Sequence, residues 1–283
     1  MSPELESSYR HCQRLARKAA SSFYLAFWLL PRGKRRSMHA LYAFLRRTDD
    51  LADSHAPLPA RHEALHAWRE SLQRALDGAY DDPMWPAVHD TVKRHDIPHG
   101  YLHAAIDGVQ MDLEGRAYGT FADLETYLDR VASVVGLSCL HVWGADLPAA
   151  VPPARRCGHA YQMTNILRDL SEDLSSGRLY LPRDDLERFG CSPPDLRRGE
   201  PRQNVAELLQ FEVQRTRELY RAGDELRPLL SRDGRRIFAA MTATYRALLD
   251  RIERLGPDVL VRRPAIPKWR KLMAVGRGWC EAG

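Results

Sequence analysis

Apolar residues recur at the helical period along nearly the whole chain. Leu65, Trp68 and Leu72 follow one another at intervals of three and four residues, and residues 208–220 repeat this pattern. Such intervals place side chains on one face of an α-helix, whereas a half-buried strand alternates at every second residue. Alternating runs of useful length are missing from the sequence. The pattern therefore predicts an all-α protein.

Short breaks rich in proline and glycine divide this pattern into helices of roughly 15 to 30 residues. The breaks fall at residues 57–59, 81–86, 97–100, 147–153, 190–201 and 230–234, and around Gly256. They are too short and too regular to be domain linkers, and we find no internal repeat. We therefore expect residues 1–283 to form a single helical domain.

The segment of residues 35–54, RRSMHALYAFLRRTDDLADS, combines an apolar face with a polar stripe beside it. Projection at ~100° per residue defines the stripe. It consists of Tyr42, Arg46, Asp49 and Asp53. A solvent-exposed helix with surface ion pairs, such as Arg46 with Asp50, would show similar spacing. This segment alone therefore leaves a functional site and a solvated face as alternatives.

A second segment shows the same pattern of polar residues along one helical stripe. It covers residues 161–182, with the sequence YQMTNILRDLSEDLSSGRLYLP. An amide pair and two carboxylates share one helical stripe. The stripe consists of Gln162, Asn165, Asp169 and Asp173. Ile166 lies on the same side, which indicates an inward face, and Arg168 is adjacent to the first aspartate.

Two D-x-x-x-D pairs on inward faces are costly to bury unless cations or ligands compensate their charge. Mg²⁺ prefers oxygen ligands and completes its coordination shell with water and substrate phosphates. A diphosphate bridged to both pairs by Mg²⁺, with Arg46 and Arg168 on its remaining oxygens, would satisfy every charge. The two segments together therefore predict metal-assisted departure of a diphosphate.

The composition is that of an ordinary folded protein, with 44% apolar and 28% charged residues among 283. No stretch reaches the ~20 apolar residues that a membrane span needs, and the first ten residues lack the features of a signal peptide. The five cysteines are scattered, which argues against a disulfide framework or a zinc site. We therefore expect a cytoplasmic protein.

The formal net charge is +5, and arginine greatly outnumbers lysine. Arginine suits bidentate binding of phosphate or carboxylate. The charge by itself leaves nucleic acid, anionic lipid and a small phosphorylated substrate open as partners.

With these motifs, the sequence resembles the squalene/phytoene synthases, which join two prenyl diphosphates head to head (1-1′). Four blocks carry the resemblance, in family order and over nearly the whole chain. They are SSFYLAFWLLP (residues 21–31), LYAFLRRTDDLAD (41–53), DLETYLDRVASVVG (123–136) and QMTNILRDLSEDLSSGRLYLP (162–182). Either aspartate motif alone would be a weak signal, whereas four ordered blocks make chance agreement very unexpected.

The resemblance implies an all-α, single-domain isoprenoid synthase fold around a central cavity, with the aspartate motifs facing each other across its mouth. Carried over position by position, it assigns roles to named residues. The metal ligands for two or three Mg²⁺ ions, or Mn²⁺ in their place, are Asp49, Asp53, Asp169 and Asp173. The catalytic residues at the diphosphates are Tyr42, Arg46, Arg168 and Tyr245. The substrate-binding residues are Ser22, Phe23, Phe27, Val131, Ala132, Gly136, Gln162 and Asn165.

Part of this set also forms a pattern of its own, because Ala132, Gly136, Cys139 and Trp143 share one helical face at intervals of four, three and four. Three small residues followed by a large one would suit close helix packing. With an isoprenoid tail to accommodate, the same face becomes a groove wall with Trp143 towards its floor. Ser22 and Phe23 are expected in a flexible segment that closes over the reacting diphosphate.

The implied reaction is Mg²⁺-dependent condensation of two farnesyl or two geranylgeranyl diphosphates through a cyclopropylcarbinyl diphosphate. The products are presqualene diphosphate or squalene in the first case and phytoene in the second, and NADPH is needed only for squalene. The resemblance does not separate these substrates. The expected partners are the prenyl diphosphate and, transiently, a membrane surface that attracts the basic chain, but no nucleic acid. We expect a monomer.

Two other functions remain as alternatives. A terpene cyclase or a head-to-tail prenyltransferase would share the fold and the Mg²⁺ chemistry but not the first and last of the four blocks. A non-catalytic relative acting as an assembly factor should have lost some metal carboxylates, and all four are present. Among the residues given less weight, His99 and His103 are expected to have a structural or surface role. Asp107 and Asp112 are expected to support the site indirectly or to be structural, and Arg263 and Lys271 to belong to a solvated basic tail.

Overall fold

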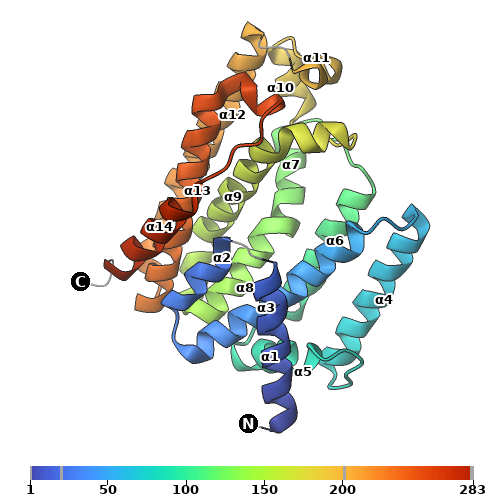
Figure 1. Cartoon of the computed structure of the whole chain (residues 1–283), viewed down its shortest axis with the longest axis vertical. Helices are drawn as coiled ribbons and strands as arrows, with labels where there is room; N and C mark the ends of the chain where they lie inside the picture. The colour runs from blue at the N-terminus through green and yellow to red at the C-terminus, as the bar shows by residue number, and fades with distance from the viewer. Residues whose placement is uncertain (1, 20–21, 200–201, 281–283) are drawn as a thin grey trace.

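The computed structural model describes residues 2–19, 22–199 and 202–280, and these form helices without any strand (Figure 1). The α-helices are α1 (Pro3–Lys18), α2 (Ser22–Ala26), α3 (Arg32–Ala52), α4 (Leu58–Leu76), α5 (Trp85–Arg94), α6 (His99–Leu113), α7 (Phe121–Leu128), α8 (Val134–Trp143), α9 (Leu147–Ser175), α10 (Arg183–Arg188), α11 (Pro193–Arg198), α12 (Gln203–Gly223), α13 (Arg232–Leu255) and α14 (Lys268–Cys280). The shorter turns are the 3₁₀ helices η1 (Phe27–Leu29), η3 (Asp224–Leu229) and η4 (Gly256–Leu260) and the π-helical turn η2 (Asp129–Ser133). The predicted all-α fold is confirmed.

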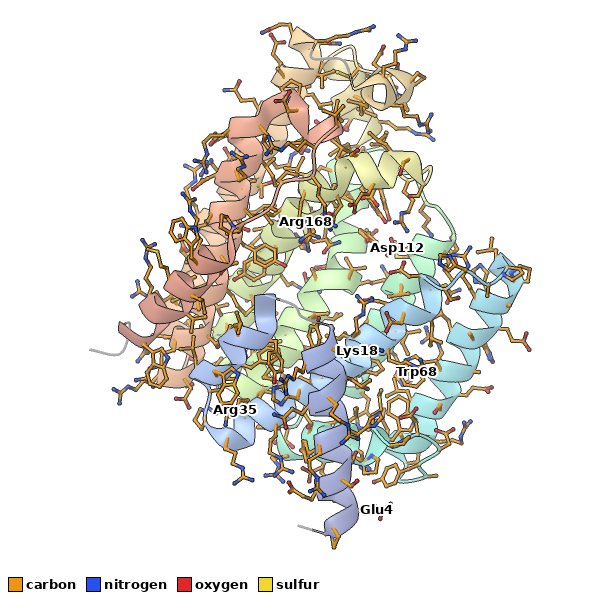
Figure 2. All side chains as sticks on the ribbon, in the orientation of Figure 1. Glu4, Lys18, Arg35, Trp68, Asp112 and Arg168 are labelled. Atoms are coloured by element: carbon orange, nitrogen blue, oxygen red, sulfur yellow. The ribbon has the colours of Figure 1, made fainter. Side chains whose placement is uncertain are left out.

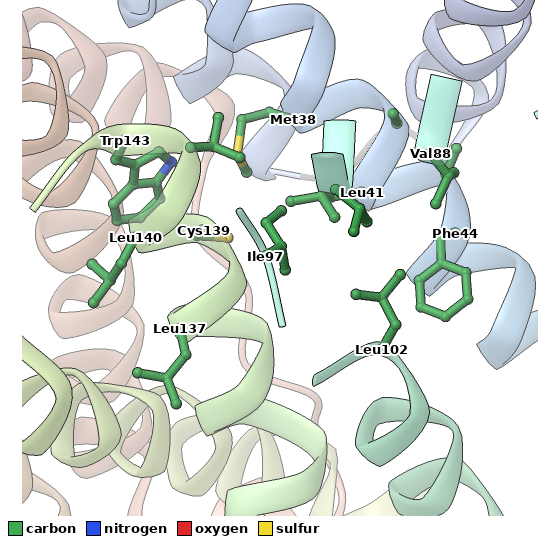
Figure 3. Close-up of a cluster of buried hydrophobic side chains, with 14 of the residues drawn as sticks. Met38, Leu41, Phe44, Val88, Ile97, Leu102, Leu137, Cys139, Leu140 and Trp143 are labelled. Carbon is green, nitrogen blue, oxygen red and sulfur yellow. The ribbon is translucent and has the colours of Figure 1, made fainter. Parts of the chain in front are cut away.

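The long helix α9 runs through the middle of the bundle (Figure 1). It packs against α8, α12, α13 and η2, whereas α3 packs against α1, α4, α5 and α6. One apolar core lies around α3, α5 and α8, where Phe44, Leu102 and Leu140 are among the buried side chains (Figure 3). A second core lies between α9, α12 and α13. The space between α3 and α9 is therefore framed by two packed halves of the molecule.

The predicted break at residues 147–153 is wrong, because these residues form the first two turns of α9. Pro148 lies in the first turn, where a missing N–H costs no hydrogen bond. Pro152 and Pro153 lie inside the helix and leave two carbonyls without donors. Those carbonyls belong to Pro148 and Ala149, which are exposed and can bond to water.

A glycine decides how closely α9 approaches the π-helical turn η2. A Cβ on Gly158 would lie 3.0 Å from the Cα of Ser133 and 3.1 Å from the carbonyl carbon of Ala132. These are backbone atoms, so the neighbouring turn could not yield to a larger residue. Glycine at this position therefore lets α9 hold η2, and with it Val131 and Ala132, against the centre of the bundle.

Candidate active site

A cavity of about 490 Å³ opens between α3, α6, α8, α9 and α13. Most of the residues predicted for the site line it. These are Phe27, Tyr42, Arg46, Asp49, Val131, Ala132, Gly136, Cys139, Trp143, Gln162, Asn165, Arg168 and Tyr245. The small-residue face of α8 and η2 thus lines the cavity, and it also packs closely against α9.

The character of the lining changes along the two central helices. On α3 it runs from Met38 and Leu41 to Arg46 and Asp49, and on α9 it runs from Ala154 to Arg168. In both helices the polar residues come last, so polar groups gather at one end of an otherwise apolar chamber. The arrangement suits a molecule with a charged head and a long apolar tail.

The carboxylates of the first predicted motif lie at this polar end. The Asp49 side chain is accessible to solvent from the cavity. Protein atoms nevertheless surround it on most sides, so little bulk water remains around its carboxylate. Its pKa is raised to about 7, mainly by this desolvation and then by the neighbouring Asp53. Asp53 itself is exposed at the end of α3, and Asp50 forms an ion pair with Arg46 at 2.6 Å.

The carboxylates of the second motif are held by arginines. The Nε of Arg168 donates to Oδ1 of Asp169 at 2.8 Å, and the Arg263 guanidinium lies 2.7 Å from the same oxygen. Asp173 is buried and lies 3.2 Å from Arg178. Burial raises the pKa of Asp173 to about 6, although Arg178 opposes the shift. Asp53, Asp169 and Asp173 lie outside the lining of the main cavity.

A further carboxylate, that of Asp112 on α6, also lines the cavity, and Figure 2 labels it together with Arg168 of α9. The hydroxyl of Tyr180 donates to Asp112 at 2.9 Å, and burial raises the pKa of this carboxyl above its usual range. Its negative charge also contributes to the raised pKa values of Asp49 and Asp173. Carboxylates from α3, α6 and α9 therefore share one electrostatic environment.

Within the described ranges, no three His, Cys, Asp or Glu side chains lie close enough together to hold a metal ion by themselves. The aspartate pairs of α3 and α9 are thus separate groups. The amide oxygen of Asn165, by contrast, is buried without a hydrogen-bond donor, while its Nδ2 donates to Oε1 of Gln162 at 3.2 Å. A buried oxygen without a donor is costly, and a cation or a ligand would satisfy it.

The two predicted tyrosines line the chamber from different helices. Tyr42 on α3 packs edge-on against Phe27, and Tyr245 on α13 packs against Tyr161, with ring centroids 4.6 Å apart. Burial raises the pKa of Tyr245 to about 12, although Arg168 opposes the shift. The Tyr245 phenol therefore remains neutral.

Sequence reasoning underestimated Arg263 and missed Arg178 and Tyr180. Arg263 does not belong to a solvated tail, because it pairs with Asp169 and, at 3.1 Å, with Glu172. Arg178 and Tyr180 were available in the fourth block, where Gly177, at φ +82°, turns the chain back towards the site. The side chains of Ser22, Phe23 and Lys271 lie outside the described residues; the backbone of Ser22 and Phe23 belongs to α2.

The sequence of this chain is similar to those of known prenyl diphosphate-using enzymes. The family model described as squalene/phytoene synthase matches residues 16–270. The chain is 35% identical to a 15-cis-phytoene synthase of Synechococcus elongatus, over 96% of this chain and 92% of that protein. It is 36% identical to a phytoene synthase of Arthrospira platensis, over 95% and 91%.

Solved structures show the same fold. A dehydrosqualene synthase in complex with a ligand superposes with a TM-score of 0.89 at 29% identity, covering 98% of this chain and 97% of that chain. A squalene synthase from Alicyclobacillus acidocaldarius superposes with a TM-score of 0.85 at 30% identity, covering 90% and 97%. The predicted family is therefore confirmed: the chain belongs to the squalene/phytoene synthase family and is a prenyltransferase.

Proposed function

We propose that this protein condenses two molecules of geranylgeranyl diphosphate head to head and yields phytoene. The observation that carries the proposal is the chamber itself, which has an apolar interior and a polar end where arginines and carboxylates meet. The family uses prenyl diphosphates in general. The curated relatives named phytoene synthase favour the C20 substrate over the C15 one.

The residues at the polar end fit Mg²⁺. Carboxylate and amide oxygens are the hard ligands that this ion prefers, and the Asn165 oxygen lacks a donor. Loss of bulk water and neighbouring carboxylates raise the pKa values of Asp49 and Asp173, and a bound cation would offset both effects. Asp49 and Asp53 on one side, and Asp169 and Asp173 on the other, would hold the ions. Bound there, Mg²⁺ would neutralise charge on the departing diphosphate.

The protein's own residues would act in sequence on the two substrates. Arg46 and Arg168 bind the diphosphate oxygens, and the hydroxyls of Tyr42 and Tyr245 donate hydrogen bonds to them. When the first C–O bond breaks, the electron pair leaves with the diphosphate and an allylic cation remains in the chamber. The apolar walls, Val131 and Phe27 among them, exclude water that would otherwise capture the cation.

The second substrate then supplies the electrons for the new bond. Its 2,3-double bond attacks the cation, and loss of a proton closes a cyclopropylcarbinyl diphosphate. Because the Tyr245 phenol is neutral, its oxygen is a poor base, and the released diphosphate is the better proton acceptor. A second ionisation releases the other diphosphate, the resulting cation rearranges to the 1-1′ skeleton, and loss of a second proton gives phytoene.

The test is incubation of the purified protein with Mg²⁺ and either geranylgeranyl or farnesyl diphosphate, with and without NADPH, followed by product analysis. We expect phytoene from the C20 substrate without NADPH. If only the C15 substrate reacted and gave squalene or dehydrosqualene, the enzyme would make C30 products, as the names of the two structural neighbours indicate for those proteins. Absence of any coupled product would contradict the proposal.

We further propose that the enzyme acts as a monomer at the edge of a membrane, since both the tails of its substrates and its product are hydrocarbons. No helix in the described part of the chain has the length and apolar character needed to cross a bilayer.

A further inference from the structure

The last helix, α14, lies along the outside of α13, at the edge of the bundle (Figure 1). Among the side chains of α14 that the structure describes, Ala274 and Gly278 are at buried positions and Val275 is partly buried against the core. A Cβ on Gly278 would lie 2.6 Å from the carbonyl oxygen of Arg236 and 2.8 Å from Cδ1 of Leu29. The small residues Ala274 and Gly278 thus allow α14 to approach the backbone of α13 and the Leu29 side chain of η1 closely.

The outer face of the same helix is apolar. Trp269 is 55% exposed, Leu272 59% and Met273 52%. At ~100° per residue, these three side chains point away from Ala274 and Gly278. A surface helix normally turns its large apolar residues inward, so α14 has the reverse arrangement.

The apolar surface continues onto neighbouring segments. Helix α14 also contacts α2 and η1, where Leu25 is 37% exposed and Trp28 is 52% exposed. Among the described residues, six of the nine exposed large apolar side chains belong to these three segments. We call this surface the α14 face. Its members are Leu25, Trp28, Trp269, Leu272, Met273 and Trp279.

Arginines lie beside the tryptophans of the α14 face. Residues 268–280 contain four basic residues and no acidic one. An arginine guanidinium also lies over each exposed tryptophan: Arg35 at 4.3 Å from Trp28, Arg270 at 5.3 Å from Trp269, and Arg236 at 5.3 Å from Trp279. Tryptophan side chains and basic residues at the rim of an apolar face are typical of helices that lie in a membrane interface.

We propose that the α14 face docks on the surface of an anionic lipid bilayer, with α14 lying in the plane of the interface. The charge selects this occupant, because the basic rim attracts anionic headgroups and would repel the same rim on a second copy of the chain. A helix of 13 residues is too short to span the bilayer.

Docking would bring the bilayer next to the catalytic chamber. Phe27 lines the chamber, and the adjacent Trp28 belongs to the α14 face. Helix α13 likewise lies between the two, because Phe238 and Met241 line the chamber while Ala240 lies beneath α14. The turn η1 and helix α13 therefore lie between the α14 face and the chamber.

The test is co-sedimentation of the intact protein with vesicles of pure phosphatidylcholine or of phosphatidylcholine with phosphatidylglycerol. The variant Trp269→Ser/Leu272→Ser/Met273→Ser removes the apolar outer face from exposed positions. We expect the wild type to bind the anionic vesicles at low salt and the variant to bind at least tenfold more weakly. The control Leu58→Ser/Tyr80→Ser changes exposed apolar residues elsewhere and should bind like the wild type.

A second variant, Arg270→Glu/Arg277→Glu, separates charge from apolar contact. Its binding to anionic vesicles should fall at least tenfold, and added salt should weaken the wild type in the same direction. Equal binding by the serine variant, or equal binding to neutral vesicles, would overturn the proposal. So would a wild-type dimer in sedimentation velocity that the serine variant converts to monomer. The assay contains no prenyl substrate, so its failure would leave the proposed condensation untouched.

Discussion

Asp49 and Asp173 are carboxylates whose surroundings disfavour their ionised forms. Their pKa values are raised to about 7 and about 6 because both have lost bulk water and face other carboxylates. Divalent cations at the site would reverse this and favour ionisation. Arg46 already acts in this direction on Asp49, but it also pairs with Asp50 and does not cancel the loss of bulk water.

Replacing Asp49 by asparagine should lower turnover by roughly a hundredfold or more, because a proposed metal ligand is removed at the position where charge develops. The melting temperature should hardly change, since the substitution removes a charge that the fold disfavours. Product formation and thermal unfolding measure the two effects. Asp77→Asn, at an exposed position after α4, is the matched control and should be normal in both. Near-normal turnover in Asp49→Asn would remove Asp49 from the site.

Glu212 predicts a pH dependence of stability away from the chamber. This fully buried residue of α12 lies beside Arg215, which also binds Asp185 of α10. Burial raises the pKa of Glu212 from 4.5 to about 8, so the folded chain keeps a proton that the unfolded chain releases. The free energy of unfolding should therefore fall as the pH rises from about 4.5 to about 8, by at most ~1.4 kcal/mol per pH unit.

Urea unfolding at several pH values measures this slope. Glu212→Gln should flatten it, because the glutamine cannot ionise, whereas Glu218→Gln, at an exposed position of the same helix, should leave it unchanged. The same slope in the wild type and in Glu212→Gln would contradict the assignment.

At the scale of elements, the contact between α9 and η2 sets the position of one chamber wall. Gly158→Ala should destabilise the fold by about 1–3 kcal/mol, because the new Cβ meets backbone atoms of η2 that cannot move aside. It should also impair turnover by displacing Val131 and Ala132. Gly100→Ala, in α6 with open space around it, should be neutral or slightly stabilising. Chemical unfolding compares the stabilities of the Gly158→Ala and Gly100→Ala variants. Equal stabilities would mean that the backbone of η2 moves to make room for the new Cβ.

At the scale of the whole molecule, the chamber between the two halves limits the substrate. Gly136 lines it, and the nearest heavy atom to an added Cβ, the carbonyl oxygen of Ala154, is 4.0 Å away. Gly136→Leu should therefore fill part of the chamber without disturbing the helix contacts. The activity with geranylgeranyl diphosphate should fall at least tenfold more than that with farnesyl diphosphate, in line with the ~10- to 200-fold effect of one methylene in a tight pocket. Equal losses of activity with both substrates would show that this wall does not determine which substrate length the chamber accepts.

The sequence by itself determined the features that depend on neighbours along the chain. Helical periodicity predicted the all-α fold, and spacings of three and four placed Tyr42, Arg46 and Asp49 on one stripe and Gln162 and Asn165 on another. The four ordered blocks indicated the family. Such predictions succeed because a helix fixes the relative direction of residues within a few turns.

Only the tertiary structure decided the contacts between distant segments. Arg263 meets Asp169, and Tyr180 meets Asp112, across 94 and 68 residues. Nor could periodicity show that α14 turns its large apolar residues outward, because a pattern gives the faces of a helix but not which face meets the core. These outcomes depend on how helices pack, and packing is set by all the contacts of the bundle together rather than by any one segment.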